Sequence, residues 1–205
     1  MTLSEALAKI QAMRQPVFRT ADIMAALDVQ KSYASKMLER LSSHGHVYRL
    51  KKGLWTLAGG VEPLVLVPHM TAPFPSYVSL QSALYFHDMI SQIPEVIYCV
   101  SLARTKTYVT PVATFSVHHI KGNFFFGYEE RGEKGIKMAT PEKALVDILY
   151  LGQARSKLFE ALPEVEFPRR FDVKRANGMI LKIADPRRRE YALNRFHRLL
   201  AGITH

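Results

Sequence analysis

The chain of 205 residues contains one cysteine, Cys99, and no long apolar run. A single cysteine excludes an internal disulfide and any metal site built from several thiolates. A membrane-spanning helix needs about 20 consecutive apolar residues, so contact with a membrane is not expected. The opening residues, "MTLSEALAKIQAMRQ", lack the apolar core and cleavage site of a signal peptide, which predicts a cytoplasmic protein. Cys99 lies in the strand-like stretch "EVIYCVSL" and is predicted to be buried.

Motifs of catalytic sites are also missing: G-x-x-x-x-G-K-[ST], G-x-G-x-x-G, H-E-x-x-H and G-x-S-x-G do not occur. His118 and His119 are neighbours in a strand-like stretch, where adjacent side chains point to opposite faces and cannot readily ligate one ion. Glu142 and Asp147 share a predicted helix without an acidic partner at helical spacing. Glu142 is interpreted as stabilising the helix amino terminus, and Asp147 as a surface group or an ion-pair partner. We therefore predict no enzyme, no cofactor and no metal ion.

Acidic residues are scarce at both ends of the chain. Residues 1–60 carry nine Lys and Arg against four Asp and Glu, and residues 152–205 carry twelve against six, whereas residues 61–151 are nearly neutral. The net charge is +10 at pH 7. This asymmetry indicates contact with a polyanion at the two ends, most simply nucleic acid. A solubilising surface charge is the alternative.

The first sixty residues have the pattern of three helices followed by a β-hairpin. Apolar residues at helical spacing predict helices from about Leu3 to Arg14 and from Lys31 to His44, with a short helix capped by Thr20 between them. Two strand-like runs within residues 47–57 flank a Lys-Lys-Gly turn, where Gly53 suits a positive φ. This order is that of a winged helix-turn-helix, in which a recognition helix enters the major groove of double-stranded DNA.

The outward face of the third helix is the candidate reader of base edges. With its apolar residues turned inward, short polar and basic side chains face solvent, and such side chains can pair with bases in the major groove. The candidate recognition residues are Lys31, Ser32, Tyr33, Ser35, Lys36 and Arg40. The candidate phosphate contacts of the wing are Arg49, Lys51, Lys52 and Gly53. The alternative is that the helix and the hairpin contact another protein and not DNA.

Glycines and prolines in "GGVEPLVLVP" predict a boundary that divides the chain into domains of residues 1–60 and 61–205. In the second domain, "MTAPFPSYVS" is interpreted as a proline-rich connection, and Ser79 as the cap of a helix, "LQSALYFHDMI". Strands are predicted in "EVIYCVSL", "TYVT", "ATFSVHHI", "FFFGYEE" and "GIKMAT". Thr140 followed by Pro141 predicts the start of a helix that Gly152 ends.

Further helices are predicted near Ser156, after Asp172 and after Asp185. The predicted fold class is α+β: a winged helix-turn-helix and then a mixed α/β domain with a basic, helical end. The basic residues of that end form a candidate second surface for a polyanion: Arg169, Arg170, Lys174, Arg175, Arg187, Arg188 and Arg189. A solvated basic tail is the alternative.

The strings "SYVSLQSALYFHDMI", "TPVATFSVHHI" and "ATPEKALVDILYL" resemble the AbiEi family of antitoxins, the transcription-regulating partners in AbiE-type, type IV toxin–antitoxin systems. The resemblance covers nearly the whole chain, with "SLQSALYFH" and "ATPEKALVDILYL" as its more specific pieces. It implies a winged helix that binds inverted repeats in its own promoter. The recognition-helix positions fall on Lys31, Ser32, Tyr33, Ser35 and Lys36, and the wing falls on residues 49–53.

The resemblance also implies a second domain that neutralises a nucleotidyltransferase-type toxin of an abortive-infection system, without a stable complex. Three alternatives remain open: a plain winged-helix repressor without a toxin partner, a protein-interaction module that binds a toxin directly, and an enzyme acting on nucleic acid through residues assembled from distant positions.

Overall fold

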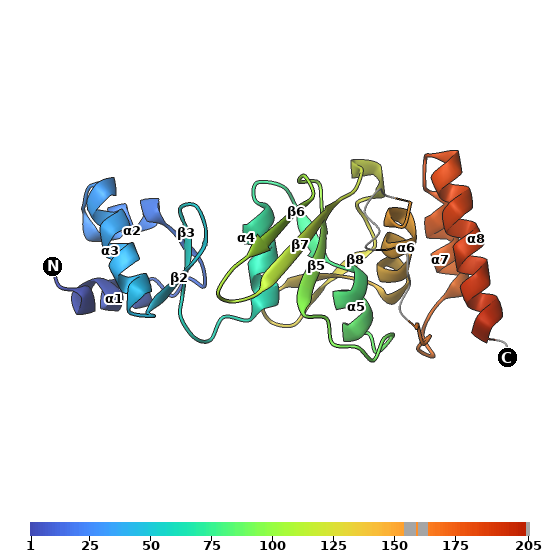
Figure 1. Cartoon of the computed structure of the whole chain (residues 1–205), viewed down its shortest axis with the longest axis horizontal. Coiled ribbons are helices and arrows are strands. Elements are labelled where there is room, and N and C mark those ends of the chain that lie inside the picture. The colour runs from blue at the N-terminus through green and yellow to red at the C-terminus, as the bar shows by residue number, and fades with distance from the viewer. Residues whose placement is uncertain (154–158, 160–163, 204–205) are drawn as a thin grey trace.

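The computed structural model describes residues 1–153, 159 and 164–203. The molecule is elongated, with the amino-terminal helices at one end, a sheet in the middle and the last two helices at the other end (Figure 1). The predicted α+β class is confirmed: helices dominate the first part and a larger sheet follows. Among the described residues, no helix is both long and apolar enough to cross a membrane.

Three helices and a small sheet form the amino-terminal part. They are α1 (Leu3–Ala12), α2 (Thr20–Leu27) and α3 (Lys31–Ser43), with β1 (Phe18–Arg19), β2 (Val47–Lys51) and β3 (Leu54–Leu57). Strand β3 lies between β1 and β2 and is antiparallel to both. Gly53, in the turn between β2 and β3, has the positive φ predicted for it, +73°. Helices α1 and α3 end within two residues of their predicted ends.

The start of α2 differs from the prediction, because Thr20 does not cap it. Arg19 occupies the cap position, and its backbone N–H donates to Asp22 Oδ2 at 2.6 Å. The Thr20 hydroxyl instead accepts a hydrogen bond from Trp55 Nε1 at 3.1 Å. The Thr20 side chain, which the sequence pattern assigned to capping, therefore makes a tertiary contact with Trp55.

The small sheet packs in two directions. Val47 and Trp55 belong to the hydrophobic cluster formed with the three helices. Val17, Leu50 and Leu54 belong to the larger cluster, which continues through the rest of the chain. The hairpin is therefore held against the second part of the molecule.

A mixed sheet of six strands forms the middle of the molecule, in the order β6-β7-β5-β4-β9-β8. The strands are β4 (Ser76–Val78), β5 (Val96–Ser101), β6 (Lys106–Val109), β7 (Thr114–His119), β8 (Tyr128–Arg131) and β9 (Ile136–Ala139). The pairs β5–β7 and β4–β9 are parallel, and the other neighbours are antiparallel. Each of the five predicted runs overlaps one of the strands β5 to β9.

Two segments differ from the sequence prediction. The stretch interpreted as a proline-rich connection contains β4, and before it come a 3₁₀ turn η1 (Pro63–Leu66) and a short helix α4 (Val67–Thr71). The aromatic run of "FFFGYEE" lies outside β8: its first residue ends η2 (Gly122–Phe124), and Gly127 turns the chain before the strand with a φ of +78°.

Four further helices are described: α5 (Leu80–Phe86), α6 (Pro141–Leu151), α7 (Val173–Leu181) and α8 (Pro186–Ile203). The helix starts predicted at Thr140, after Asp172 and after Asp185 are confirmed, and each of these side chains caps its helix by accepting the backbone N–H three residues later. Ser79 precedes α5 but makes no capping hydrogen bond. The helix predicted near Ser156 lies outside the described residues.

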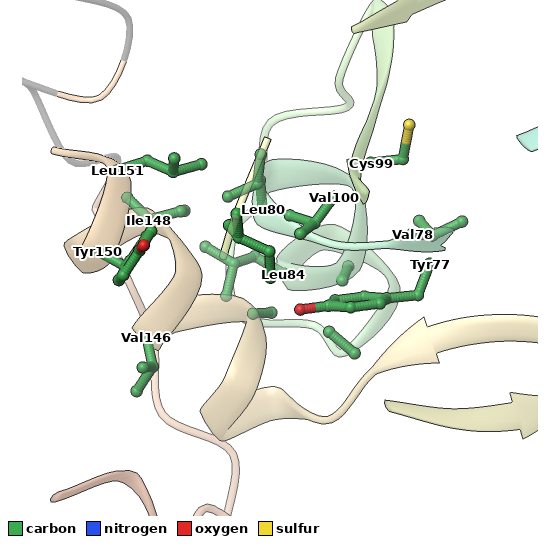
Figure 2. Packing of buried hydrophobic residues seen from close by; sticks show 14 of the residues in the cluster. Tyr77, Val78, Leu80, Leu84, Cys99, Val100, Val146, Ile148, Tyr150 and Leu151 are labelled. Atoms are coloured by element: carbon green, nitrogen blue, oxygen red, sulfur yellow. The ribbon is translucent and has the colours of Figure 1, made fainter. Parts of the chain in front are cut away.

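Helix α6 lies at the centre of the larger core. Every residue from Glu142 to Leu151 is buried, because the helix contacts α5, α7, α8 and β9. Figure 2 shows its apolar side chains together with those of the sheet and α5, and the Tyr77 ring with its hydroxyl directed toward α6. Polar side chains of α6 are therefore enclosed as well.

Cys99 is fully buried in β5, as predicted, and burial raises the pKa of its thiol to about 12. Only a thiolate reacts readily with alkylating reagents. We expect Cys99 to resist iodoacetamide at neutral pH in the folded protein and to be alkylated in urea, as measured by intact-mass spectrometry. Rapid alkylation of the folded chain would contradict this placement.

Candidate nucleic-acid interface

Helix α3 presents an outward arc of polar and basic side chains. Its buried residues are the predicted apolar set Ala34, Met37, Leu38 and Leu41. On the opposite arc lie the six candidate recognition residues, with Lys31, Ser32, Tyr33, Lys36 and Arg40 exposed and Ser35 half-buried. Glu39 is exposed on the same arc. A glutamate can accept a hydrogen bond from cytosine, as Lys and Arg donate to guanine, so the arc offers both kinds of base contact.

The first turn of α3 has no side-chain cap. Gln30 is the cap residue and makes no capping hydrogen bond, and the turn contains no acidic residue. The amide groups at the start of the helix therefore keep the partial positive charge of the helix dipole. Tyr33 lies at the edge of the arc, where its hydroxyl is 3.5 Å from the carbonyl oxygen of Met1.

The hairpin places two of its cations in solvent. Arg49 is exposed on β2, with its guanidinium 5.7 Å from the centre of the Trp55 ring. Lys52 is exposed at the turn beside Gly53. Among the described residues neither Arg49 nor Lys52 forms an ion pair. Both are therefore available to an anion.

Lys51 points elsewhere. Its Nζ donates to the backbone carbonyl of Met70, at 3.1 Å, in the last turn of α4. Burial lowers the pKa of Lys51, and the nearby Arg19 and Lys106 add to this effect. The structure therefore separates Lys51 from Arg49 and Lys52: its ammonium joins the hairpin to the second part of the chain.

The candidate second basic surface is only partly exposed. Arg169, Arg170, Lys174, Arg175 and Arg187 are exposed. Arg188 and Arg189 are half-buried: the Arg188 guanidinium lies 4.5 Å from the centre of the Tyr150 ring, and Arg189 Nη1 donates to the Ile183 carbonyl at 3.3 Å. The run of three arginines at the start of α8 thus contributes one exposed cation and two packed ones.

The two neighbouring histidines point to opposite faces of β7, as predicted. His118 is buried, with its pKa lowered to about 4 by loss of hydration, and shares a 2.9 Å hydrogen bond between Nε2 and Ser116 Oγ. His119 is exposed. Among the described residues, no group of three or more His, Cys, Asp or Glu side chains could hold a metal ion.

Sequence reasoning missed a buried polar cluster in α6. Asp147 is fully buried, which corrects its interpretation as a surface group, and it is the ion-pair partner of Lys143, with Nζ and Oδ1 2.6 Å apart. Asp147 Oδ2 also accepts hydrogen bonds from Ser79 Oγ at 2.7 Å and from the Tyr77 hydroxyl at 3.0 Å. The i,i+4 spacing of Lys143 and Asp147, in a helix whose other residues after Glu142 are apolar or aromatic, was the available signal.

Burial governs the ionisation of this cluster. It raises the pKa of the Asp147 carboxyl and lowers that of the Lys143 ammonium, while the charge of each partner opposes the shift of the other. Glu142 is also buried, and its Oε1 accepts the backbone N–H of Asp172 at 3.1 Å. Glu142 therefore joins α6 to the start of α7, which corrects its interpretation as an acid serving its own helix.

The amino-terminal part is similar to a family of transcriptional regulators. Residues 5–58, which span α1 to β3, match the family model described as "Transcriptional regulator, AbiEi antitoxin". The resemblance to AbiEi antitoxins is thereby confirmed for this segment, and the family is one of regulators, with no positive sign of catalysis. The strings of the second part that carry the same resemblance lie outside the matched residues. No curated protein matches the chain.

Proposed function

We propose that the chain is a transcriptional autorepressor whose residues 1–60 form a winged helix-turn-helix domain bound to operator DNA. Helix α3 is the recognition helix and the β2–β3 hairpin is the wing. The observation that carries the proposal is the outward arc of α3, with exposed Lys31 and Lys36, next to a hairpin that bears exposed Arg49 and Lys52. These elements lie within the residues that match a family of transcriptional regulators.

Different contacts have different roles in this proposal. The α3 residues enter the major groove of an inverted-repeat operator and select the sequence. Arg49 and Lys52 contact phosphates and fix the orientation of the protein on the duplex, without reading bases. Lys51 makes no DNA contact in this proposal, because its ammonium is hydrogen-bonded to the backbone carbonyl of Met70.

We further propose that residues 61–205 counteract a nucleotidyltransferase toxin of a cytoplasmic, type IV abortive-infection system. The support is the family match of residues 5–58 together with the strings "SLQSALYFH" and "ATPEKALVDILYL". A nucleotidyltransferase reading frame beside the gene, and rescue of growth when both are expressed, would support this half of the proposal. Failure of rescue would leave a plain repressor, and a stable toxin complex without DNA affinity would favour an interaction module.

The affinity for DNA upstream of the gene is expected to fall log-linearly with salt, with a slope near −5 if about six phosphates are neutralised. The variant Lys52→Ala should flatten this slope by about one unit and weaken binding to all sequences alike. Lys51→Ala is the matched control: it removes the same charge from the adjacent residue, but its ammonium is bound to Met70. Fluorescence anisotropy at several KCl concentrations measures both slopes.

Equal flattening by Lys51→Ala and Lys52→Ala would show that the hairpin leaves the second part when DNA binds. Unchanged binding after substitutions in both α3 and the hairpin would reject the winged-helix proposal.

A further inference from the structure

A cavity of about 350 Å³ lies between the sheet and the carboxyl-terminal helices. It is lined by Thr105, His118, His119, Lys121, Tyr150, Leu151, Phe159 and Arg188. Helices α6 and α8, which form one wall, lie at the end of the molecule away from α3 (Figure 1). The cavity is therefore separate from the proposed DNA interface, and its volume falls in the range of small-molecule sites.

The cavity carries positive charge without compensation. Lys121 and Arg188 line it, and no acidic side chain does so among the described residues. The buried Nε of Arg188 has no hydrogen-bond partner within the described parts of the chain. An anion in the cavity would neutralise the charge of Lys121 and Arg188, which line it.

The Arg188 side chain is held in place by a stack of aromatic rings. Its guanidinium lies 4.5 Å from the centre of the Tyr150 ring, and Phe124 stacks on the same ring at 4.5 Å between centroids. Since one ring cannot receive both groups on one face, Arg188 and Phe124 occupy opposite faces of Tyr150. Lys143 Nζ in turn lies 3.7 Å from the centre of the Phe124 ring. A guanidinium fixed in this way loses little freedom when it binds a ligand.

A neutral donor lies beside the two cations. Thr105 Oγ1 accepts the backbone N–H of His119 at 3.0 Å, which leaves its own O–H free to donate. The His119 ring is held by its Nδ1, which donates to the carbonyl oxygen of Ala103 at 3.1 Å. Leu151 and Phe159 supply the apolar part of the wall.

We propose that this cavity binds a small phosphate monoester. The phosphate would accept hydrogen bonds from Arg188, Lys121 and the Thr105 hydroxyl, and the organic part would lie against Leu151 and Phe159. A guanidinium fork matches phosphate oxygens with two parallel hydrogen bonds, which an isolated ammonium cannot make. This inference concerns the carboxyl-terminal end alone and does not depend on DNA binding.

Isothermal titration calorimetry of the full chain with adenosine 5′-monophosphate tests the proposal. We expect saturable binding, competition by inorganic phosphate, and no comparable binding of adenosine. Arg188→Met should weaken binding by about tenfold or more, which corresponds to the loss of one charge-assisted hydrogen bond. Arg187→Met is the matched control, because this neighbouring arginine is exposed and does not line the cavity.

A second variant, Lys121→Gln, changes an exposed side chain and keeps the Tyr150 stack intact. It should also weaken binding of the monophosphate, while the thermal stability of the protein stays the same as that of the wild-type chain. Absence of binding to the wild-type chain, equal binding of adenosine, or an equal loss in Arg187→Met would each overturn the proposal.

Discussion

Replacing Asp147 by alanine is expected to lower the free energy of unfolding by about 3–5 kcal/mol, because the Lys143 ammonium would remain buried without a counter-charge. The two charged groups are 2.6 Å apart and both side chains are fully buried. The other contacts of Lys143 Nζ are the Phe124 carbonyl at 3.0 Å and the ring faces of Phe124 and Phe126. These contacts carry only partial negative charge and cannot replace a carboxylate.

Loss of the carboxylate also leaves two hydroxyl groups without their acceptor. Ser79 and Tyr77 both donate to Asp147 Oδ2, and both residues are fully buried. The double variant Lys143→Met/Asp147→Leu removes both charges and restores apolar volume. Because apolar replacement of a buried ion pair is often neutral or stabilising, we expect it to recover the part of the loss in Asp147→Ala that comes from the uncompensated Lys143 charge and the lost volume. The part that comes from the two hydroxyl groups should remain, since leucine offers them no acceptor.

Urea denaturation followed by far-UV circular dichroism measures these differences. Glu129→Ala is the control, since it breaks an exposed ion pair with Arg131, at 2.9 Å, for which a loss below about 1 kcal/mol is expected. A loss in Asp147→Ala no larger than that in Glu129→Ala would show that the buried pair is not an ionic contact.

The same experiment examines the predicted boundary at residue 60. The only tryptophan, Trp55, lies in the cluster of the three amino-terminal helices, whereas Asp147 lies in the larger core. If residues 1–60 form a separate domain, the Trp55 fluorescence transition should stay in place when Asp147→Ala shifts the dichroism transition. A joint shift of both would indicate one cooperative unit, coupled through Val17, Leu50 and Leu54.

Local sequence patterns were sufficient to predict the buried and exposed faces of α3, because helical spacing alone decides which of its side chains can face the core. The burial of Lys51 and Asp147, in contrast, depends on segments that are distant in sequence and pack over these side chains. A lysine at a hairpin turn is solvated unless another segment approaches, and here Met70 in α4 does so. Asp147 is enclosed because β4 and the start of α5 pack on α6, and its partners Tyr77 and Ser79 lie 70 and 68 residues earlier in the chain.

The helical turns between the two parts were not predicted. Pro63 and Pro68 were interpreted as marks of a domain boundary, and they occupy the first turns of η1 and α4. A proline in the first turn loses no helical hydrogen bond, because that N–H has no partner inside the helix. The same residue type therefore fits a loop or a helix start, and the choice depends on whether the following side chains reach a core, as Leu66 and Met70 do.

The double variant Lys31→Ala/Lys36→Ala is expected to weaken binding to the operator by roughly 2–6 kcal/mol, if each side chain makes one base contact worth about 1–3 kcal/mol. Both lysines are exposed on the outward arc of α3, and their removal creates no cavity. The loss should be much smaller on unrelated DNA, because base contacts distinguish sequences whereas phosphate contacts do not. The ratio of operator to unrelated-DNA affinity is therefore the decisive measurement, made by competition at one salt concentration.

Lys137→Ala is the control for total charge, since this exposed lysine lies on β9 and contacts the Tyr128 ring. It should change both affinities slightly and leave their ratio unchanged. If the ratio also stays constant in Lys31→Ala/Lys36→Ala while both affinities fall, α3 contacts phosphates only. The sequence would then be read by another element or through the shape of the duplex, because electrostatic contact with the backbone alone gives equal losses on every sequence.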